Sequence, residues 1–537
     1  MNTLVKRVAL FVGLLLVVSF TQAQTVKRIE LPLPSNNSEL FSIPLGEQGV
    51  LVLTQLSKTN FTLNRFDTNL EQVWSINGTI DGNLDYVKHS YDGKNLYLLF
   101  SRYRSNVYEV IKVNIGPGFI EKFQIMSVDR MEVSDFQALN ASVFIAGMVN
   151  SQPVILYSNL LERKIKVLPS ALKSQAEIQS LELDSTASLI NVTYAVGTRG
   201  KNYQLVVKSF DESGKQIAQV VMNPESEFAM MNGKLNIVSD STQVMFGTYG
   251  HKNTIGSSRG PTSQGIYFSK LLDNEVTDLK FHSFTDFKNF FNFMSERQKE
   301  KQERKIQEKK EKGEDLRLDY RLLVHDIIKQ DDKYIMVAEA FYADYRYNNN
   351  NYGLYNTGFG MGSFNPYSTF YNPYRWGYGN YGLYSPFSSY YSPWGWGNRY
   401  YNNNQQTFDG WIYTHAIVAA FDEKGNLLWD NSIEMKNVRE AKLSEKVKAS
   451  IKGDEITLSY SNKGQIFTKI IKGDKVLEDT QSSKITTAIE GDKIKETTSD
   501  AIDFWYGNYF IASGYQRINN ETEGGKRNVF YLNKVSF

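Results

Sequence analysis

Short runs of hydrophobic residues recur along this chain at a nearly constant interval. The first four runs are centred on Leu51, Tyr97, Phe144 and Val192, at intervals of 46, 47 and 48 residues. They are rich in β-branched and aromatic residues and only about five residues long, which predicts strands. A second run of the same kind follows each of them, so the pattern predicts paired strands. Four later copies, two of them after long insertions, are centred on Met245, Met336, Leu458 and Phe510.

A turn signature with a constant spacing closes several of these pairs. An Asp follows the second run, and the residue seven positions later is bulky or apolar, as at Asp67 and Trp74. The Asp side chain can bond the backbone of its own turn, and a Gly can take the positive φ that closes it. The predicted structural turn residues are Asp67, Trp74, Asp211, Gly214, Asp422, Gly425 and Trp429.

The clearest copy, Phe-Asp-x-x-Gly-x-x-x-Trp at 421–429, resembles the blade repeat of quinoprotein-like (PQQ-like) β-propellers. The resemblance implies an all-β propeller of four-stranded blades, which suits a period near 47 residues. Eight strand pairs predict eight blades, or seven if one pair is misassigned. The segment 26–33 can add the closing strand to the last blade. Enzymatic members commonly carry a vicinal disulfide, which this chain without Cys cannot form, so the resemblance favours the non-enzymatic scaffold type without a cofactor.

The first insertion, at 284–320, is a charged helical segment. Phe287, Phe290 and Phe291 recur at helical spacing, and Ser295 and Gln298 form a capping box for a helix that ends at Gly313. Such a helix can be an arm that meets an acidic partner or lipid head groups. The pattern favours a solvated helix packed by its Phe-rich start, because runs of charge usually only solvate a face.

The second insertion, at 342–408, is an aromatic segment of low complexity. The stretch from Tyr342 to Tyr401 holds 15 of the 33 tyrosines, and 347–407 contains two charged residues. With little aliphatic surface to bury, it predicts a loop that projects from one blade with few blade contacts. Such a loop can bind a protein or stack on sugars, or it can be disordered and have no partner. The interaction candidates are Tyr371, Tyr374, Arg375, Trp376, Tyr378, Tyr390, Tyr391, Trp394, Trp396 and Arg399.

The N-terminus has the layout of a secretory signal peptide, 1–23. Lys6 and Arg7 precede a thirteen-residue apolar run, and a small-residue site ends at Ala23. The run is shorter than the roughly 20 residues of a membrane span. Because the chain has no Cys, lipoprotein anchoring, disulfides and thiolate chemistry are excluded. We expect an exported protein, in the periplasm or at the surface of a Gram-negative bacterium.

Charge and motifs narrow the function classes. The formal net charge is +2, which argues against nucleic-acid binding. The five His residues lack metal-ligand spacing, and His325, in an apolar run, is expected to be structural. No phosphate loop, dinucleotide motif or serine-nucleophile elbow occurs. The sequence therefore predicts no catalytic residue, no metal ligand and no cofactor site.

These observations favour a non-catalytic propeller that acts as a scaffold for an envelope protein or a glycan, with peripheral outer-membrane association compatible. One alternative is a carbohydrate-active propeller enzyme, because a propeller can gather acids or tyrosines from distant blades at its centre. A second alternative is an outer-membrane β-barrel, since the chain ends in Phe537 after partly alternating apolar residues. The period near 47 residues fits a barrel poorly, because barrel strands repeat as segments of about ten residues.

Overall fold

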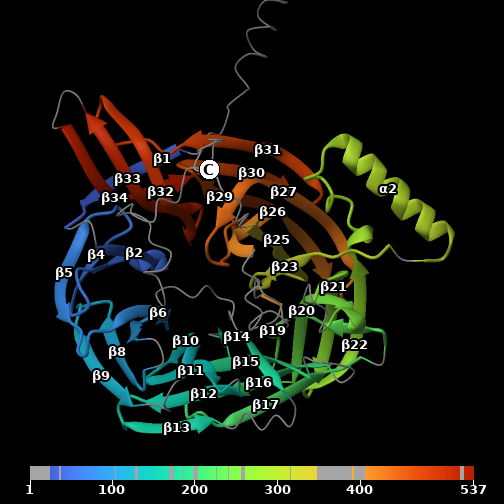
Figure 1. The fold of residues 1–537 in the computed structure, drawn as a ribbon, viewed down its shortest axis with the longest axis horizontal. Coiled ribbons are helices and arrows are strands. Elements are labelled where there is room, and N and C mark those ends of the chain that lie inside the picture. Colours follow the sequence, from blue (N-terminus) through green and yellow to red (C-terminus); the bar gives the residue numbers. More distant parts are fainter. Residues whose placement is uncertain are drawn as a thin grey trace, which may run out of the picture.

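Eight separate four-stranded sheets stand around a common axis and form a β-propeller (Figure 1). The computed structural model describes residues 24–537 apart from 35–37, 103–104, 127–130, 151, 169–174, 185–186, 198–202, 225, 240, 256–260, 315, 348–389, 392–405 and 521–524. The predicted signal peptide thus lies outside the described residues. The eight separate sheets, each with a free outer strand, confirm the propeller. A β-barrel, the second alternative, would be one closed sheet, so that alternative is wrong. No helix in the described part of the chain is long and apolar enough to cross a membrane.

Each blade runs from an inner strand near the axis to an outer strand at the rim. The inner strands of blades 1 to 8 are β2 (Glu39–Pro44), β6 (Asp85–Tyr91), β10 (Glu132–Leu139), β14 (Ala176–Asp184), β18 (Phe228–Met230) with β19 (Lys234–Ile237), β23 (Arg321–Val324) with β24 (Ile328–Gln330), β28 (Lys448–Lys452) and β32 (Asp492–Tyr506). The second strands are β3 (Val50–Gln55), β7 (Asn95–Ser101), β11 (Ser142–Val149), β15 (Leu189–Val196), β20 (Thr242–His251), β25 (Lys333–Tyr347), β29 (Glu455–Asn462) and β33 (Tyr509–Asn520).

The third strands are β4 (Asn60–Phe66), β8 (Val107–Asn114), β12 (Gln152–Asn159), β16 (Gln204–Phe210), β21 (Gly265–Leu272), β26 (Gln406–Asp422), β30 (Gln465–Lys472) and β34 (Gly525–Ser536). The outer strands are β5 (Gln72–Thr79), β9 (Ile120–Met126), β13 (Lys164–Leu168), β17 (Gln216–Met222), β22 (Glu275–Ser283), β27 (Leu427–Glu440), β31 (Lys475–Lys484) and, in blade 8, β1 (Gln24–Pro32). The eight predicted strand pairs are the second and third strands, so all eight are confirmed.

The ring is closed by the two ends of the chain. β1 pairs antiparallel with β34, with Arg28 opposite Asn533 and Leu31 opposite Phe530. The guanidinium of Arg28 also donates to Gln516 on β33 at 2.8 Å. The closing strand expected at 26–33 is therefore confirmed as the outer strand of blade 8.

The hydrophobic core lies between the blades. The described residues form eight buried apolar clusters, seven of which lie at a boundary between two neighbouring blades. The eighth fills the boundary between blades 6 and 7 and extends to residues of blades 4 and 5. In β3, Val-Leu-Val-Leu-Thr-Gln is buried at all six positions, because neighbouring blades cover both faces of the sheet. This explains why the second strands read as continuous apolar runs rather than alternating ones.

The predicted Asp turns join the third strand of a blade to its outer strand. Asp422 Oδ1 accepts the backbone N–H groups of Lys424 and Asn426 at 2.9 and 2.8 Å, and Gly425 has a φ of 74°. A Cβ on Gly425 would lie 2.0 Å from the ring of Phe268 in the preceding blade. Asp67 and Asp211 bond their own turns in the same way. The turn therefore requires Gly both for its backbone and for packing between blades.

Trp74 extends this contact to the following blade. Its indole N–H donates to the carbonyl of Ile115 at 3.2 Å, in the corresponding turn of blade 2. A Cβ on Gly118 of that turn would lie 3.2 Å from the indole ring. Trp429 makes a looser contact with Gly473 in blade 7, where the nearest indole atom would be 3.7 Å from a Cβ. The predicted turn residues thus fasten neighbouring blades to one another.

The two faces of the ring carry different connections. Because successive strands are antiparallel, connections within the first and last strand pairs of a blade lie on one face, here called the turn face. Those between second and third strands, and between blades, lie on the other, here called the insertion face. The segment 284–320 joins β22 to β23, and the aromatic segment joins β25 to β26. Both long insertions therefore leave from the insertion face.

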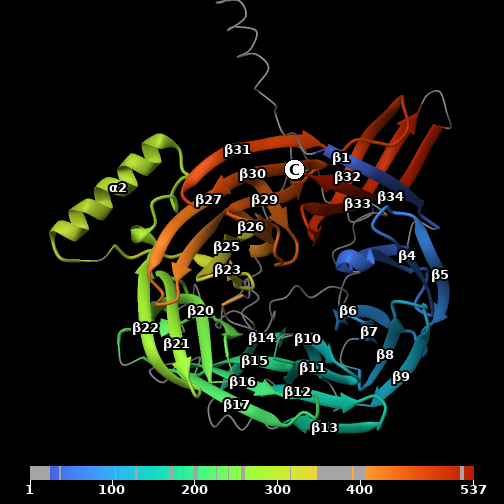
Figure 2. The ribbon, with the colours of Figure 1, turned by 180° about the vertical axis from the view of Figure 1, so that it is seen from behind.

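The helix of the first insertion is α2 (Glu296–Glu311), which stands clear of the ring (Figures 1 and 2). The capping box of Ser295 and Gln298 is present, and Gly313 follows the helix with a φ of 67°. The helical spacing of the Phe-rich stretch was misleading, since 287–294 forms turns instead. The backbone N–H groups of Lys288 and Asn289 bind the carboxylate of Asp430 on β27, and the Phe rings fill the boundary between blades 5 and 6.

Replacing Gly425 with Ala tests the packing of the turn between blades. The added methyl meets Phe268 and the backbone is left-handed, so we expect a loss of about 2–5 kcal/mol in the free energy of unfolding. Gly453→Ala is the matched control, because Gly453 has a φ of 58° and open space around it. The control should lose only about 1–2 kcal/mol. Chemical denaturation measures both, and equal losses would contradict the packing contact.

Candidate functional site at the axis of the ring

The inner strands are irregular at the same level in neighbouring blades. In blades 2, 3 and 4 the register shifts by one residue just before Lys88, Asp135 and Ser180. In blades 5 and 6 the inner strand is split in two, at 231–233 and 325–327. Bulges of this kind re-aim side chains and are common beside binding sites. They bring polar side chains to mid-height around the axis.

Charged side chains at this level form ion pairs between blades. Lys88 of blade 2 pairs with Asp135 of blade 3, whose side chain is 2% exposed. The other carboxylate oxygen of Asp135 accepts the N–H of Leu181 in blade 4 at 3.3 Å. Because both groups are largely buried, removing one partner would leave the other charge uncompensated. The pair therefore fixes three successive blades.

Lys234 of blade 5 occupies the centre of a second set. Its Nζ lies 2.6 Å from Glu182 of blade 4 and 3.1 Å from Asp326 of blade 6. Burial alone would lower the pKa of Lys234, but the two carboxylates outweigh it and raise that pKa well above the ordinary value. Lys234 is thus a permanent cation shared by three blades.

His325 and Glu339 belong to the boundary between blades 6 and 7. His325 Nε2 lies 2.9 Å from Glu339 Oε1, which also accepts the N–H groups of Lys446 and Val447 at 2.8 and 2.7 Å. Burial would lower the pKa of His325, but Glu445 and the bond to Glu339 outweigh it and raise that pKa above its usual value. The sequence-based expectation of a structural role for this histidine fits its position.

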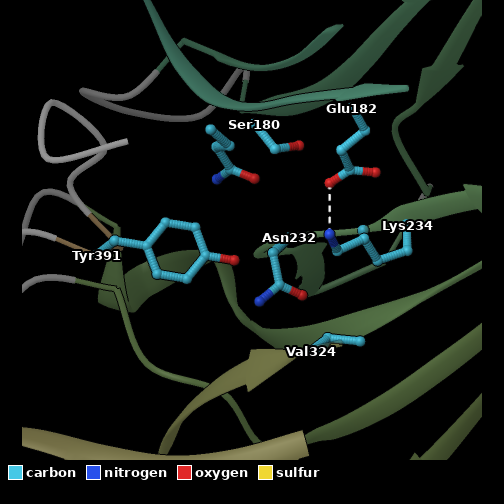
Figure 3. Close-up of a pocket in the computed structure, with 8 residues that line it drawn as sticks. Ser180, Glu182, Asn232, Lys234, Val324 and Tyr391 are labelled. Atoms are coloured by element: carbon cyan, nitrogen blue, oxygen red, sulfur yellow. Dashed lines mark ion pairs between the residues drawn. The ribbon is translucent and has the colours of Figure 1, made fainter. Parts of the chain in front are cut away.

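A small polar cavity lies beside Lys234 (Figure 3). Its volume is about 10 Å³, which is room for one water molecule. Gln179 donates its amide N–H to the carbonyl of Met231 at 2.6 Å, while its buried Oε1 has no partner among the described residues. The cavity is lined by Gln179, Ser180, Glu182, Asn232, Gly233, Lys234, Val324 and Tyr391.

Tyr391, which lines this cavity, comes from the aromatic insertion, and so does its neighbour Tyr390. Both are buried, with 5% and 1% of their surface exposed. The Tyr390 hydroxyl lies 2.7 Å from the Ser263 hydroxyl and accepts the backbone N–H of Leu322 at 2.9 Å. The expectation of few blade contacts is therefore wrong for these two residues, which fasten the insertion to blades 5 and 6.

The other predicted contact residues cannot be placed. Tyr371, Tyr374, Arg375, Trp376, Tyr378, Trp394, Trp396 and Arg399 lie outside the described residues, and their role stays a prediction. Tyr390 and Tyr391 face the interior instead of solvent.

The residues that converge at the axis had no signal in the sequence. Glu182, Lys234 and Asp326 come from three blades, and each looks like an ordinary surface residue beside a turn. Among the described residues, no group of three or more His, Asp or Glu side chains is placed to hold a metal ion.

Comparisons with known proteins add a likeness in fold. No family model matches this chain. No curated protein matches it either. Among solved structures, it is similar to the propeller domain of the Trilobed protease from Pyrococcus furiosus, at 9% identity and a TM-score of 0.34, over 84% of this chain and 93% of that one.

Two other similar structures are enzymes. One is the polysaccharide lyase Uly1, at 7% identity and a TM-score of 0.36, over 96% of this chain and 99% of that one. Another is a prolyl endopeptidase, at 8% identity and a TM-score of 0.34, over 84% of this chain and 50% of that one. At such identities and scores these likenesses leave the activity of this chain undetermined, and the quinoprotein-like resemblance stays a prediction.

Tyr390→Phe tests the anchor of the insertion. The variant keeps the ring but leaves the buried N–H of Leu322 and the Ser263 hydroxyl without this partner, so the free energy of unfolding should fall by about 1–3 kcal/mol. Tyr342→Phe is the control, since Tyr342 is 51% exposed, and it should change stability by less than about 0.5 kcal/mol. Equal effects in urea denaturation would contradict the anchor.

Two histidines should give opposite pH dependence. Burial lowers the pKa of His415 to about 3. Below about pH 6.5 the imidazole of His415 is therefore protonated in the unfolded chain but stays neutral in the native protein. The free energy of unfolding of the wild type, relative to that of His415→Gln, should fall by up to about 1.4 kcal/mol per pH unit as the pH falls from 6.5 toward 4.

The pKa of His325 is raised in the native protein. Its contribution to the free energy of unfolding is therefore complete below about pH 6.5 and is lost as the pH rises through the native pKa. The difference in the free energy of unfolding between the wild type and His325→Gln should therefore favour the wild type more at pH 6 than at pH 9. Denaturation curves at several pH values measure both differences, and parallel trends for the two variants would contradict these assignments.

Proposed function

We propose that this protein is an exported, non-catalytic β-propeller that serves as an interaction scaffold in the bacterial cell envelope. Its partner would be an envelope protein or a glycan. The proposal places the chain with the scaffold members of the quinoprotein-like propellers, as the turn motif at 421–429 suggests. The signal-like segment 1–23 supports export to the periplasm or the surface of a Gram-negative cell.

The observation that carries the proposal is that both long insertions leave from one face of a rigid ring. One insertion supplies the charged helix α2, in which no residue is buried. The other supplies the aromatic segment, whose sequence is rich in the Tyr and Trp that dominate binding hot spots. Tyr390 and Tyr391 fix the position where this segment meets the ring. α2 lies outside the rim of the ring (Figures 1 and 2), and in this proposal a partner contacts α2, the aromatic segment or both.

The charges at the axis also support a structural use of the ring's centre. Lys88 pairs with Asp135, and Lys234 pairs with Glu182 and with the exposed Asp326, in each case across a blade boundary. A group committed to a buried ion pair is costly to release for proton transfer or substrate binding. In this proposal the axis holds the blades together, and recognition takes place on the insertion face.

A carbohydrate-active enzyme is the second candidate, favoured by one observation. A tyrosine, an acid and a lysine, Tyr391, Glu182 and Lys234, line the cavity from two blades and an insertion. The exposed carboxylate of Asp326, from a third blade, lies 3.1 Å from Lys234. General acid–base chemistry on glycans uses such groups. For this candidate, the cavity of about 10 Å³ must open to admit a sugar.

A crosslinking pull-down from native cell envelope tests the scaffold. The full protein is compared with a variant in which residues 350–387 are replaced by a short Gly-Ser linker. This replacement keeps Tyr390 and Tyr391, so the ring should retain the wild-type melting temperature. The control variant carries Gln in place of Arg297, Lys301 and Arg304 on α2, which separates the charged arm from the aromatic segment.

Loss of a specific envelope partner with the linker variant is the expected result. Retention of the same partner by both variants would place the contact elsewhere on the ring. Absence of any partner for the full protein would contradict the scaffold, and cleavage of envelope glycans that is lost in Tyr391→Phe would then support the enzyme.

A further inference from the structure

The outer strand of blade 4, β17, differs from the other outer strands in its side chains. Every outer strand exposes backbone N–H and C=O groups along its free edge, and native proteins protect such edges with charges, proline or bulges. Charged residues occur in β1, β9, β13, β22, β27 and β31, whereas β5 and β17 have none. The edge of β27 also carries the turn segment that binds Asp430.

β17 and β5 differ in the side chains that they expose to solvent. In β17, Ile217 and Val221 are 50% and 42% exposed, and Gln219 between them is also exposed. Apart from Val73, the exposed positions of β5 are polar: Gln72, Ser75, Asn77 and Thr79. β17 is therefore the uncharged outer strand with apolar side chains on its open face, and it lies at the rim of the ring in Figures 1 and 2.

The backbone of β17 is regular where a partner strand would bind. β17 pairs on one side with β16, and the register from Ala218 to Met222 is continuous. A bulge occurs at Ile217, the second residue of the strand, and Pro224 follows its end. Five consecutive residues thus present an undisturbed edge.

The sequence of β17 is complementary to itself. In an antiparallel pair about a twofold axis at Gln219, Ile217 faces Val221 of the second strand, and Ala218 faces Val220. Just outside the strand, Lys215 faces Asn223, so no charge meets a like charge. In β13, whose Lys164 and Lys166 flank Ile165, the same operation about Ile165 would place lysines opposite each other. Apolar pairs across strands stabilise a sheet, and like charges oppose it.

We propose that β17 is a self-association edge, at which a second copy of this chain pairs antiparallel about a twofold axis through Gln219. The two four-stranded blades then form one continuous eight-stranded sheet. Such an interface is isologous, since the same patch is used by both subunits. It leaves the insertion faces of both rings free and does not depend on the proposed scaffold role.

The absence of Cys from the chain gives this proposal a direct test. Residues directly opposite each other across antiparallel strands have Cα atoms about 4.5–5.5 Å apart, within disulfide range. In the full protein, Gln219→Cys should form a disulfide-linked dimer under mild oxidation. Ser75→Cys, in the equally uncharged β5, is the matched control and should remain monomeric.

Sedimentation equilibrium provides the second measurement. The wild type should dimerise, and Gln219→Lys should weaken dimerisation about tenfold or more by placing two like charges on the axis. Ser75→Lys should leave it unchanged. All four substitutions are at exposed positions and should keep the wild-type melting temperature. A monomeric wild type would overturn the proposal, as would a dimer unaffected by Gln219→Lys or equal crosslinking of the two Cys variants.

Discussion

The structure depends on the burial of both faces of every blade against its neighbours. Among the described residues, the buried apolar clusters lie between blades rather than inside a single blade. A four-stranded sheet exposed on both sides would lack the burial that offsets its conformational entropy. The apolar burial that stabilises each blade is therefore supplied by its neighbours.

Polar interactions also cross the boundaries between blades. The ion pairs of Lys88 with Asp135 and of Lys234 with Glu182 join residues 47 and 52 positions apart, about one repeat. At the rim, Trp74 bonds to Ile115, 41 positions later, and Gly425 packs against Phe268 of the preceding blade, so these contacts also cross blade boundaries. The repeat period thus appears in the interactions as well as in the strands, and both the axis and the perimeter are held blade to blade.

The fold could be predicted because its strongest signals are local. The second strands are buried on both faces and read as apolar runs, while Asp422 and Gly425 mark a turn whose chemistry requires those residues. The capping box at Ser295 likewise located the start of α2. The Phe-rich stretch beside it was misassigned, because the spacing of Phe287, Phe290 and Phe291 suits a helix, whereas contacts with Asp430 impose turns.

The candidate site could not be predicted from the sequence, because its contacts are long-range. Glu182, Lys234 and Asp326 meet only after three blades have packed, and nothing local distinguishes them from solvated residues. Tyr390 and Tyr391 resemble the other tyrosines around them, yet Thr248 and Ser263, more than a hundred residues earlier, provide their polar surroundings. Side chains whose role is set by distant partners carry no periodicity of their own.

The position of β1 has a consequence for the order of assembly. This strand is the first part of the ring to be synthesised, but its partner β34 is the last. Until β34 exists, β1 has no sheet to join and blades 1 and 8 have no common boundary. The chain therefore keeps an open, non-native seam throughout synthesis and, if exported unfolded, throughout translocation. Closure of the ring therefore has to wait until β34 has been made.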